Sequence, residues 1–431
     1  MRNLCAVSSQ TERIVIVGSS LAGVRSTETL RQRGFDGEIT VIGAETHMPY
    51  DRPPLSKKFL SGDVDEERIS LRKQDVLDEL AITWRLGVAA TSLDVDARTI
   101  TLADRTEIQY DGLIIATGGT ARTLPMIPMI HGVHTLRTLG DAQRLRDSIA
   151  AGRTFVVIGA GFIGLEAAAT AKALGANVTV LEGAPAPLIR GLGAEMGTAI
   201  AAVHARNGVS VRCGVQISGI ESQGDGDSAR VTAVVLADGE RVPADDVLVG
   251  IGVSPAVEWL EGSGLTIRDG VVCDEYLNAG VPHVYAAGDL LRWPNALFTH
   301  VEPDMRVEHW TNAAEQGAIA AQNLLAEFRG EERTAYEAVP FFWSDQFDMR
   351  IQFLGRAHPD AQVTVVAGDP AEGRFAAMYT LNDRLVAVLG VTMPKMVMPS
   401  RALLLKNTST AEALVHFEKL KNPPAPPAQT A

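Results

Sequence analysis

The chain contains only three cysteines, and their positions exclude two kinds of protein. Cys5, Cys213 and Cys273 are far apart in the sequence and form no Cys-x-x-Cys or Cys-x4-Cys pair. A disulfide-stabilised scaffold is therefore excluded, and so is a redox dithiol built from neighbouring cysteines. The nine histidines show no metal-ligand spacing, because His131 and His134 have no third partner nearby, and we expect no metal site.

Long hydrophobic runs and an excess of basic residues are missing as well. The best apolar run, residues 155–165, is short and contains three glycines, whereas a membrane helix needs about 20 apolar residues. The formal net charge of −13 disfavours a nucleic-acid-binding protein, since such proteins rely on a basic surface. Residues 1–13 lack the apolar core of a signal peptide. We therefore expect a soluble, cytoplasmic protein with neither a membrane nor a nucleic-acid partner.

The residues that are present indicate a globular protein of several domains. Hydrophobic residues make up 46% of the chain and charged residues 21%, which argues against extensive disorder. The length of 431 residues corresponds to about three domains at roughly 150 residues each. Glycine is abundant, with 40 residues, and this favours tight turns and phosphate-binding loops.

The sequence contains two copies of one strand–turn–helix unit, 141 residues apart. In each copy a β-branched run ends at a glycine, Gly18 or Gly159, and a glycine-spaced turn and a helical stretch follow. A second apolar strand comes next, at residues 39–42 and 178–181. In such units the glycines permit a tight turn, close approach to a pyrophosphate and close packing of helix on strand. The helix N-terminus then offers unpaired N–H groups to the phosphates, so the repeat predicts two dinucleotide sites.

The second copy has the complete pattern for a nicotinamide dinucleotide. Gly159, Gly161 and Gly164 have the required spacing, and Glu182 closes the second strand twenty-three residues after Gly159. A carboxylate at that point accepts hydrogen bonds from the ribose hydroxyls and repels a 2′-phosphate. The second copy therefore predicts a site that favours NADH over NADPH.

The first copy departs from this pattern in two places. Ser20 replaces the middle glycine, and Gly43 stands where the acid is expected. The nearest carboxylate is Glu45, which either reaches a ribose or is an ordinary surface charge. Two dinucleotide sites in one chain predict a tightly held FAD and a transiently bound NADH, with hydride passing between them.

Four further motifs, together with the glycine turns, carry a resemblance to a known family. They occupy residues 50–57, 110–119, 247–252 and 284–289. The set resembles the flavoprotein reductases of the glutathione reductase structural class, and most of all the NADH-dependent, FAD-containing ferredoxin reductases of the putidaredoxin reductase-like type. The most specific pieces are residues 52–57, 161–166 and 342–346.

The resemblance implies an α/β fold with two Rossmann-like dinucleotide-binding domains and a C-terminal α/β interface domain. The implied FAD-binding domain is discontinuous, with a first part at 1–120 and a second part at 246–330. The NAD-binding domain at 121–245 is inserted between them. The interface domain at 331–431 would cover the flavin and dock partners. Its end, from residue 422, and the first ten residues of the chain have compositions typical of disorder.

The resemblance also implies a function. A reductase of this type passes electrons from NADH through FAD to a two-iron ferredoxin that serves a cytochrome P450 or a ring-hydroxylating oxygenase. Residues 47–50 hold no cysteine where disulfide reductases have one, so electrons must leave directly from the flavin. Two alternatives are an NADH reductase of a quinone, monodehydroascorbate or oxygen, and a redox-sensing interaction protein like apoptosis-inducing factor. We expect a monomer or weak dimer.

Ferredoxins are usually acidic, so a basic patch near the flavin would steer their encounter with the reductase. The candidate basic residues are Lys57, Lys58, Arg72, Lys73, Arg306, Lys395 and Arg401.

Four residues match positions that act on the flavin or the nicotinamide in the family. Lys57 matches the lysine near flavin N5, and Glu166 matches the acid that pairs with it. Glu308 lies in the segment that opens a helix under the isoalloxazine ring, and Trp343 matches an aromatic against the flavin or nicotinamide. Without the resemblance, Lys57 and Glu166 would be a solvated lysine and a helix-start acid, and Trp343 a packing residue.

The remaining expected contacts divide between the two cofactors. For FAD they are Gly18, Ser20, Ala22, Gly23, Glu45, Arg52, Lys57, Ala90, Thr117, Gly118, Arg137, Asp289 and Trp310. For NADH they are Gly159, Gly161, Ile163, Gly164, Glu182, Arg190 and Gly252. Asp289 could also cap the segment that follows it. Arg137 could instead form a surface salt bridge, and Arg190 could be a solvated surface charge.

Overall fold

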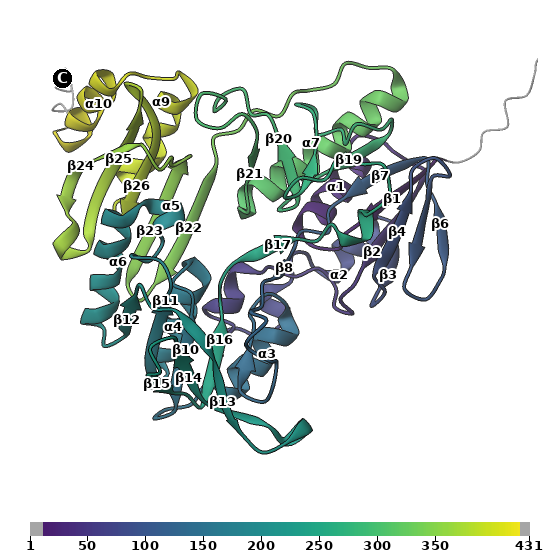
Figure 1. The fold of residues 1–431 in the computed structure, drawn as a ribbon. Coiled ribbons are helices and arrows are strands. Elements are labelled where there is room, and N and C mark those ends of the chain that lie inside the picture. The colour runs from purple at the N-terminus through teal and green to yellow at the C-terminus, as the bar shows by residue number, and fades with distance from the viewer. Residues whose placement is uncertain (1–11, 423–431) are drawn as a thin grey trace, which may run out of the picture.

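The computed structural model describes residues 12–422, which form three α/β bodies (Figure 1). The expected disordered ends, apart from residue 422, lie outside the described residues. The first body is built on a parallel sheet with the strand order β19-β7-β1-β2-β3. Its strands are β1 (Arg13–Val17), β2 (Glu38–Gly43), β3 (Thr83–Leu86), β7 (Gly112–Ile115) and β19 (Val284–Ala286). Because β19 follows the whole second body in sequence, the first body is discontinuous, as expected.

The second body repeats this arrangement in a parallel sheet with the order β12-β11-β10-β16-β9. Its strands are β9 (Val133–His134), β10 (Thr154–Ile158), β11 (Asn177–Glu182), β12 (Ser210–Cys213) and β16 (Asp246–Val249). Its helices are α3 (Leu139–Ser148), α4 (Phe162–Ala173), α5 (Ile189–Leu192) and α6 (Ala194–Arg206). In both sheets the strand before the glycine turn is central, and its apolar residues are buried as parallel strands covered on both faces require.

The expected division at 245/246 is wrong by one strand. β16 hydrogen-bonds in parallel to β10 and thereby belongs to the second sheet. The chain crosses between the two bodies through a two-stranded ribbon, in which β8 (Gly119–Ala121) pairs antiparallel with β17 (Val253–Pro255). We propose that this ribbon is the division between the FAD-binding and NAD-binding domains.

The third body carries an antiparallel sheet with the order β22-β23-β26-β25-β24. Its strands are β22 (Phe341–Gln346), β23 (Met349–Gly355), β24 (Gln362–Asp369), β25 (Arg374–Leu381) and β26 (Arg384–Val391). Its helices are α8 (Pro394–Val397), α9 (Arg401–Leu405) and α10 (Thr410–Lys421). Strand β22 contacts α4 of the second body and α7 of the first, so the third body closes over the junction of the other two (Figure 1).

Shorter elements complete the first two bodies. The small sheets contain β4 (Ala90–Asp94), β5 (Thr99–Leu102), β6 (Glu107–Gln109), β13 (Ile217–Gln223), β14 (Arg230–Leu236), β15 (Arg241–Pro243), β18 (Val271–Val272), β20 (Leu291–Trp293) and β21 (Met305–Arg306). The helices of the first body are α1 (Leu21–Gln32), α2 (Gln74–Glu79) and α7 (Trp310–Arg329).

The helices α1 and α7 pack closely because a glycine lies at their contact. A side chain on Gly317 of α7 would overlap the carbonyl of Ala22 on α1. The hydroxyl of Ser26, also on α1, donates to the carbonyl of Gly317 across the same contact at 2.9 Å. This contact holds the start of α1, which follows the first glycine turn, against the helix that begins at Trp310.

We predict that Gly317→Ala lowers the stability of the protein by about 1–3 kcal/mol, the usual cost of overpacking a closed contact. The measurement is thermal unfolding followed by circular dichroism. Gly140→Ala is the matched control, because a Cβ in the first turn of α3 meets only the flexible end of Arg144. An unchanged unfolding temperature for Gly317→Ala would contradict the close contact.

Candidate active site

The two glycine turns have the geometry that a pyrophosphate requires. Gly18 and Gly159 have φ of +124° and +100°, which allows the chain to turn sharply from strand into helix. The helices that follow, α1 and α4, begin without a side-chain cap on their N–H groups. A side chain at Gly161 would meet nothing within 4 Å, so the backbone there is open to a ligand. The uncapped helix starts therefore fit the phosphates of two dinucleotides.

The third glycine of each turn packs as the pattern predicts. A side chain at Gly23 would overlap the carbonyl of Gly18, and one at Gly164 would overlap that of Gly159. Ser20 is the N-cap residue of α1, but its side chain accepts no capping hydrogen bond. The small residue at this position therefore leaves the N–H groups of α1 available.

Glu182 lies at the end of β11, directly beside the second glycine turn. One carboxylate oxygen accepts the N–H of Ala160 at 2.7 Å, and the other accepts the N–H of Ala184 at 2.8 Å. These two backbone donors fix the position of the carboxylate. A negative charge fixed here suits ribose hydroxyls and opposes a 2′-phosphate.

The other expected NADH contacts have different surroundings. Arg190 lies on α5 and is exposed, with no ion pair to any residue in the described range 12–422. Gly252 is exposed just before β17, and Ile163 in the first turn of α4 is 46% exposed. None of these three is held by a polar partner in the way that Glu182 is, so their expected roles stay predictions.

Glu45 is not an isolated surface carboxylate. It forms an ion pair with Arg52 at 2.7 Å and accepts a hydrogen bond from the hydroxyl of Tyr50. The guanidinium of Arg52 also donates to the hydroxyl of Tyr50 and, at 2.6 Å, to the carbonyl of Arg137. The hydroxyl of Tyr50 accepts the N–H of Leu139, which begins α3. This cluster joins the loop after β2 to the second body, and its contact with the ribose stays a prediction.

Asp289 and Arg137 come together at the end of the first sheet. They form an ion pair at 2.7 Å, and both side chains are mostly buried. Arg137 also donates to the carbonyl of Gly119 in the ribbon, and the hydroxyl of Thr117 donates to the carbonyl of Ala256. Arg137 is therefore anchored between the two bodies, and its salt bridge is mostly buried rather than at the surface.

The expected FAD contacts that remain lie on three elements around this point. Ala22 is buried in the first turn of α1, Ala90 is the first residue of β4, and Gly118 follows β7. Alanine and glycine have no side-chain hydrogen-bonding group, so the expected contacts of these residues with FAD stay predictions.

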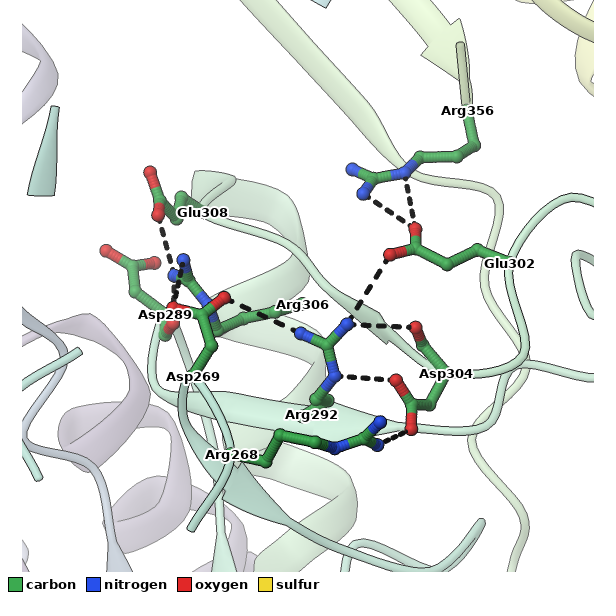
Figure 2. Close-up of polar contacts among 9 residues, drawn as sticks. All are labelled: Arg268, Asp269, Asp289, Arg292, Glu302, Asp304, Arg306, Glu308 and Arg356. Atoms are coloured by element: carbon green, nitrogen blue, oxygen red, sulfur yellow. Dashed lines mark hydrogen bonds and ion pairs between the residues drawn. The ribbon is translucent and has the colours of Figure 1, made fainter. Parts of the chain in front are cut away.

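Glu308 takes part in a charge network, which Figure 2 shows. It forms an ion pair at 2.6 Å with Arg306, which also donates to the carbonyl of Asp289. The Glu308 side chain is 40% exposed. Glu308 lies two residues before Trp310, the first residue of α7, so it belongs to the segment that opens this helix, and its expected role at the flavin stays a prediction.

The same network continues from the first body to the third. Arg292 pairs with Asp304 at 2.6 Å and with Glu302 at 3.5 Å, and Glu302 pairs with Arg356 at 2.7 Å (Figure 2). Arg356 follows β23 of the third body. The network fixes the segment between β20 and α7, and hence the backbone of Asp289.

Lys57 and Glu166 form a buried ion pair where the three bodies meet. The Lys57 ammonium lies 2.8 Å from the Glu166 carboxylate, whose side chain is only 3% exposed. The hydroxyls of Ser56 and Ser344 donate to the two oxygens of that carboxylate. Such a buried charge persists only when it is paired and hydrogen-bonded. The predicted meeting of Lys57 and Glu166 is therefore observed, and sequence reasoning missed Ser56 and Ser344.

Two tryptophans lie close to this pair. The indole N–H of Trp310, the first residue of α7, donates to Asp51 at 2.7 Å. The ring of Trp343, on β22, meets the ring of Trp310 edge-on, with centroids 6.2 Å apart. Burial raises the pKa of the Asp51 carboxyl, although the Trp310 hydrogen bond and the charge of Lys57 oppose the rise. Asp51 was also missed, and its only sequence signal is its place before Arg52 in the 50–57 motif.

Comparison with known proteins identifies the family. A model of the pyridine nucleotide-disulphide oxidoreductases matches residues 12–317, and a model of the reductase C-terminal domain matches residues 341–419. The chain belongs to the pyridine nucleotide-disulphide oxidoreductase family. FAD and NAD(H) are the cofactors that this membership implies, in agreement with the two glycine turns and their uncapped helices.

Individual relatives of this oxidoreductase span almost its whole length. Rhodocoxin reductase of Rhodococcus erythropolis is 39% identical over 91% of this chain and 89% of its own. The ferredoxin–NAD(+) reductase component of the anthranilate 1,2-dioxygenase system of Burkholderia cepacia is 38% identical, over 90% and 93%. Among solved structures, the covalent putidaredoxin reductase–putidaredoxin complex matches with a TM-score of 0.88 at 33% identity, over 95% and 98% of the two chains. These matches confirm the predicted fold class and family.

Residues 12–422 lack the features of a membrane span and of a clustered metal site. No helix in this range is long and apolar enough to cross a membrane. No cluster of three or more histidine, cysteine, aspartate or glutamate side chains in the same range has the arrangement of a metal site.

We predict that Glu182→Ala weakens NADH binding about tenfold and reduces the preference for NADH over NADPH, because a charged hydrogen-bond acceptor is lost. The measurement is the dissociation constant of each nucleotide, obtained by anaerobic titration of the oxidised protein with NAD+ and NADP+. Asp238→Ala, which removes an exposed carboxylate between β14 and β15, is the control. Unchanged selectivity in Glu182→Ala would show that Glu182 does not contact the ribose.

Proposed function

We propose that this protein is an NADH:ferredoxin reductase that transfers electrons from NADH through FAD to a two-iron ferredoxin. The downstream enzyme would be a cytochrome P450 or a ring-hydroxylating oxygenase. The relatives support both ends of this proposal, since they include reductases named for rhodocoxin and for a dioxygenase system. A solved relative is covalently joined to its redox partner putidaredoxin.

The proposal rests mainly on which side chains lie at the junction between the three bodies. A buried Lys57–Glu166 pair and two tryptophans lie there, and the segment after β2 contains no cysteine. The cysteines of the described residues lie elsewhere: Cys273 is buried in the first body, and Cys213 is beside Glu182. Burial raises the pKa of both thiols, which opposes thiolate chemistry. Electrons therefore leave the flavin without a thiol relay.

Each body supplies a different part of the site. FAD would be held by the start of α1, by the cluster around Glu45, and by Asp289 with Arg137. NADH would be held by the start of α4 and by Glu182. Bound FAD supplies the chemistry, since it accepts a hydride and releases single electrons. Lys57 would place a positive charge near the bound flavin, and Glu166 holds that ammonium in position. The third body covers this junction and limits the access of water.

The docking surface for an acidic ferredoxin would use the basic residues that lack internal partners. Arg72 pairs with Glu28, and Lys57 and Arg306 have the partners described above. The other candidates have no ion pair with any residue between 12 and 422; they are Lys58, Lys73, Lys395 and Arg401. Their charges are free to attract a partner although the chain as a whole is acidic.

We predict that NADH bleaches the flavin anaerobically and that cytochrome c reduction then depends on added two-iron ferredoxin. NADPH should be much less effective because of Glu182. The measurement is the steady-state rate of cytochrome c reduction with and without ferredoxin. Equal rates without ferredoxin, or with a quinone alone, would favour a small-molecule acceptor instead.

We also predict that replacing all three cysteines with serine leaves the ferredoxin-dependent rate unchanged, since neither cysteine between residues 12 and 422 lies at the junction. The comparison is between the wild type and Cys5→Ser/Cys213→Ser/Cys273→Ser at equal flavin content. Loss of ferredoxin reduction with normal bleaching by NADH would contradict direct transfer from the flavin.

A further inference from the structure

A chain of buried hydrogen bonds runs from Glu166 into the third body and back into the second. The Ser344 hydroxyl lies 2.6 Å from Glu166 Oε1, and Gln346 Nε2 lies 3.0 Å from Ser344 Oγ. His204 Nε2 then lies 2.8 Å from Gln346 Oε1. Ser344, Gln346 and His204 are fully buried, and Glu166 is 3% exposed. Gln346 and His204 have no role in the site as described so far.

The fold explains why these residues meet. Ser344 and Gln346 are two positions apart on β22, so both side chains point to the same face of the strand. That face meets α4, which carries Glu166, and α6, which carries His204. The chain of hydrogen bonds therefore ties one strand of the third body to two helices of the second.

The direction of each hydrogen bond follows from the chemistry of the groups. The Glu166 carboxylate, ionised beside Lys57, can only accept, so Ser344 must donate its hydroxyl proton to Oε1. The Ser344 oxygen then accepts from the amide of Gln346, which leaves the Gln346 carbonyl oxygen facing His204. His204 must therefore carry a proton on Nε2. Every donor in the chain points toward Glu166.

The other nitrogen of His204 fits this order. Nδ1 is buried and has no hydrogen-bond partner among residues 12–422. A proton on Nδ1 would thus be a buried donor without an acceptor, which costs free energy. Burial also lowers the pKa of His204, which keeps the ring neutral. Nε2–H is the tautomer that leaves no donor unpaired.

We propose that Ser344, oriented by Gln346 and His204, is a positioning residue that holds Glu166, and through it Lys57, for hydride transfer to the flavin. The inference rests on the proposed function of the Lys57–Glu166 pair. Lys57 and Ser56 contact Glu166 Oε2, whereas Ser344 is the only described partner of Oε1. Without its hydroxyl, one oxygen of a buried carboxylate loses its donor and the carboxylate is free to rotate.

The test compares Ser344→Ala with Ser400→Ala by anaerobic stopped-flow reduction of the FAD-loaded protein with NADH. Ser400 is the matched control, because it is also fully buried in the third body but donates only to the carbonyl of Met396. We expect Ser344→Ala to lower the limiting rate constant of flavin reduction about tenfold, as expected for a lost hydrogen bond to a charged group. The NADH dissociation constant should not change, and Ser400→Ala should match the wild type.

Gln346→Met gives a graded second variant, because it removes both hydrogen bonds of the amide but leaves the Ser344 hydroxyl. Its rate constant should fall between those of the wild type and Ser344→Ala. The midpoint potential of the flavin should shift to more negative values in the same order, because a displaced Lys57 stabilises the reduced, anionic flavin less.

The histidine tautomer provides a readout that is independent of activity. Nitrogen-15 NMR of histidine-labelled protein should show His204 neutral, with its proton on Nε2; the resonance is assigned by its loss in His204→Asn. A proton on Nδ1 would overturn the donor order. Glu166→Gln is the reference variant, and it should change both the rate constant of flavin reduction and the flavin potential. If it does so while Ser344→Ala changes neither, the positioning role of Ser344 is wrong.

The failure of the proposed function would be recognised separately. All of these measurements omit ferredoxin, so they do not depend on the acceptor. If Glu166→Gln itself reduces at the wild-type rate and potential, the proposed role of the ion pair is wrong, and the positioning role of Ser344 falls with it.

Discussion

The structure of the site depends on one buried carboxylate. Glu166 belongs to the second body, pairs with Lys57 of the first, and accepts a hydrogen bond from Ser344 of the third. An isolated charge at 3% exposure would be strongly unfavourable, so the first and third bodies supply the partners that this charge of the second body requires. The site is therefore complete only when all three bodies are assembled. The pairing of its buried charge thus depends on how the bodies pack against one another.

The two dinucleotide units share a fold but differ in how the acid near the end of the second strand is held in place. In the second unit, the acid at the end of the second strand is fixed by backbone N–H groups beside its own glycine turn. In the first, Glu45 is fixed by the side chains of Arg52 and Tyr50, and Arg52 and Tyr50 in turn contact the second body. The first arrangement suits a cofactor that stays bound, because its acid is part of the contact between bodies. The second suits one that exchanges, since it depends on local structure alone.

Local patterns in the sequence predicted the parts of the fold that local physics determines. Glycine spacing and β-branched runs located both turns and both parallel sheets, and family motifs paired Lys57 with Glu166. The contacts of Ser344 and Asp51 were missed, because they join residues 178 and 259 positions apart and no local pattern encodes them. The ion pair between Glu308 and its neighbour Arg306 was not predicted either, because no motif pointed to it. The division at 245/246 was misplaced because an apolar strand does not show which of two similar sheets it joins.

The central claim is that electrons pass directly from the flavin to a ferredoxin. Its most direct test mixes the NADH-reduced protein with an oxidised two-iron ferredoxin under anaerobic conditions and follows both chromophores. The account predicts that the flavin reoxidises as the ferredoxin is reduced, with two ferredoxins reduced per flavin, because each accepts one electron. A flavin that stays reduced beside oxidised ferredoxin, and reoxidises only when oxygen or a quinone is admitted, would contradict it.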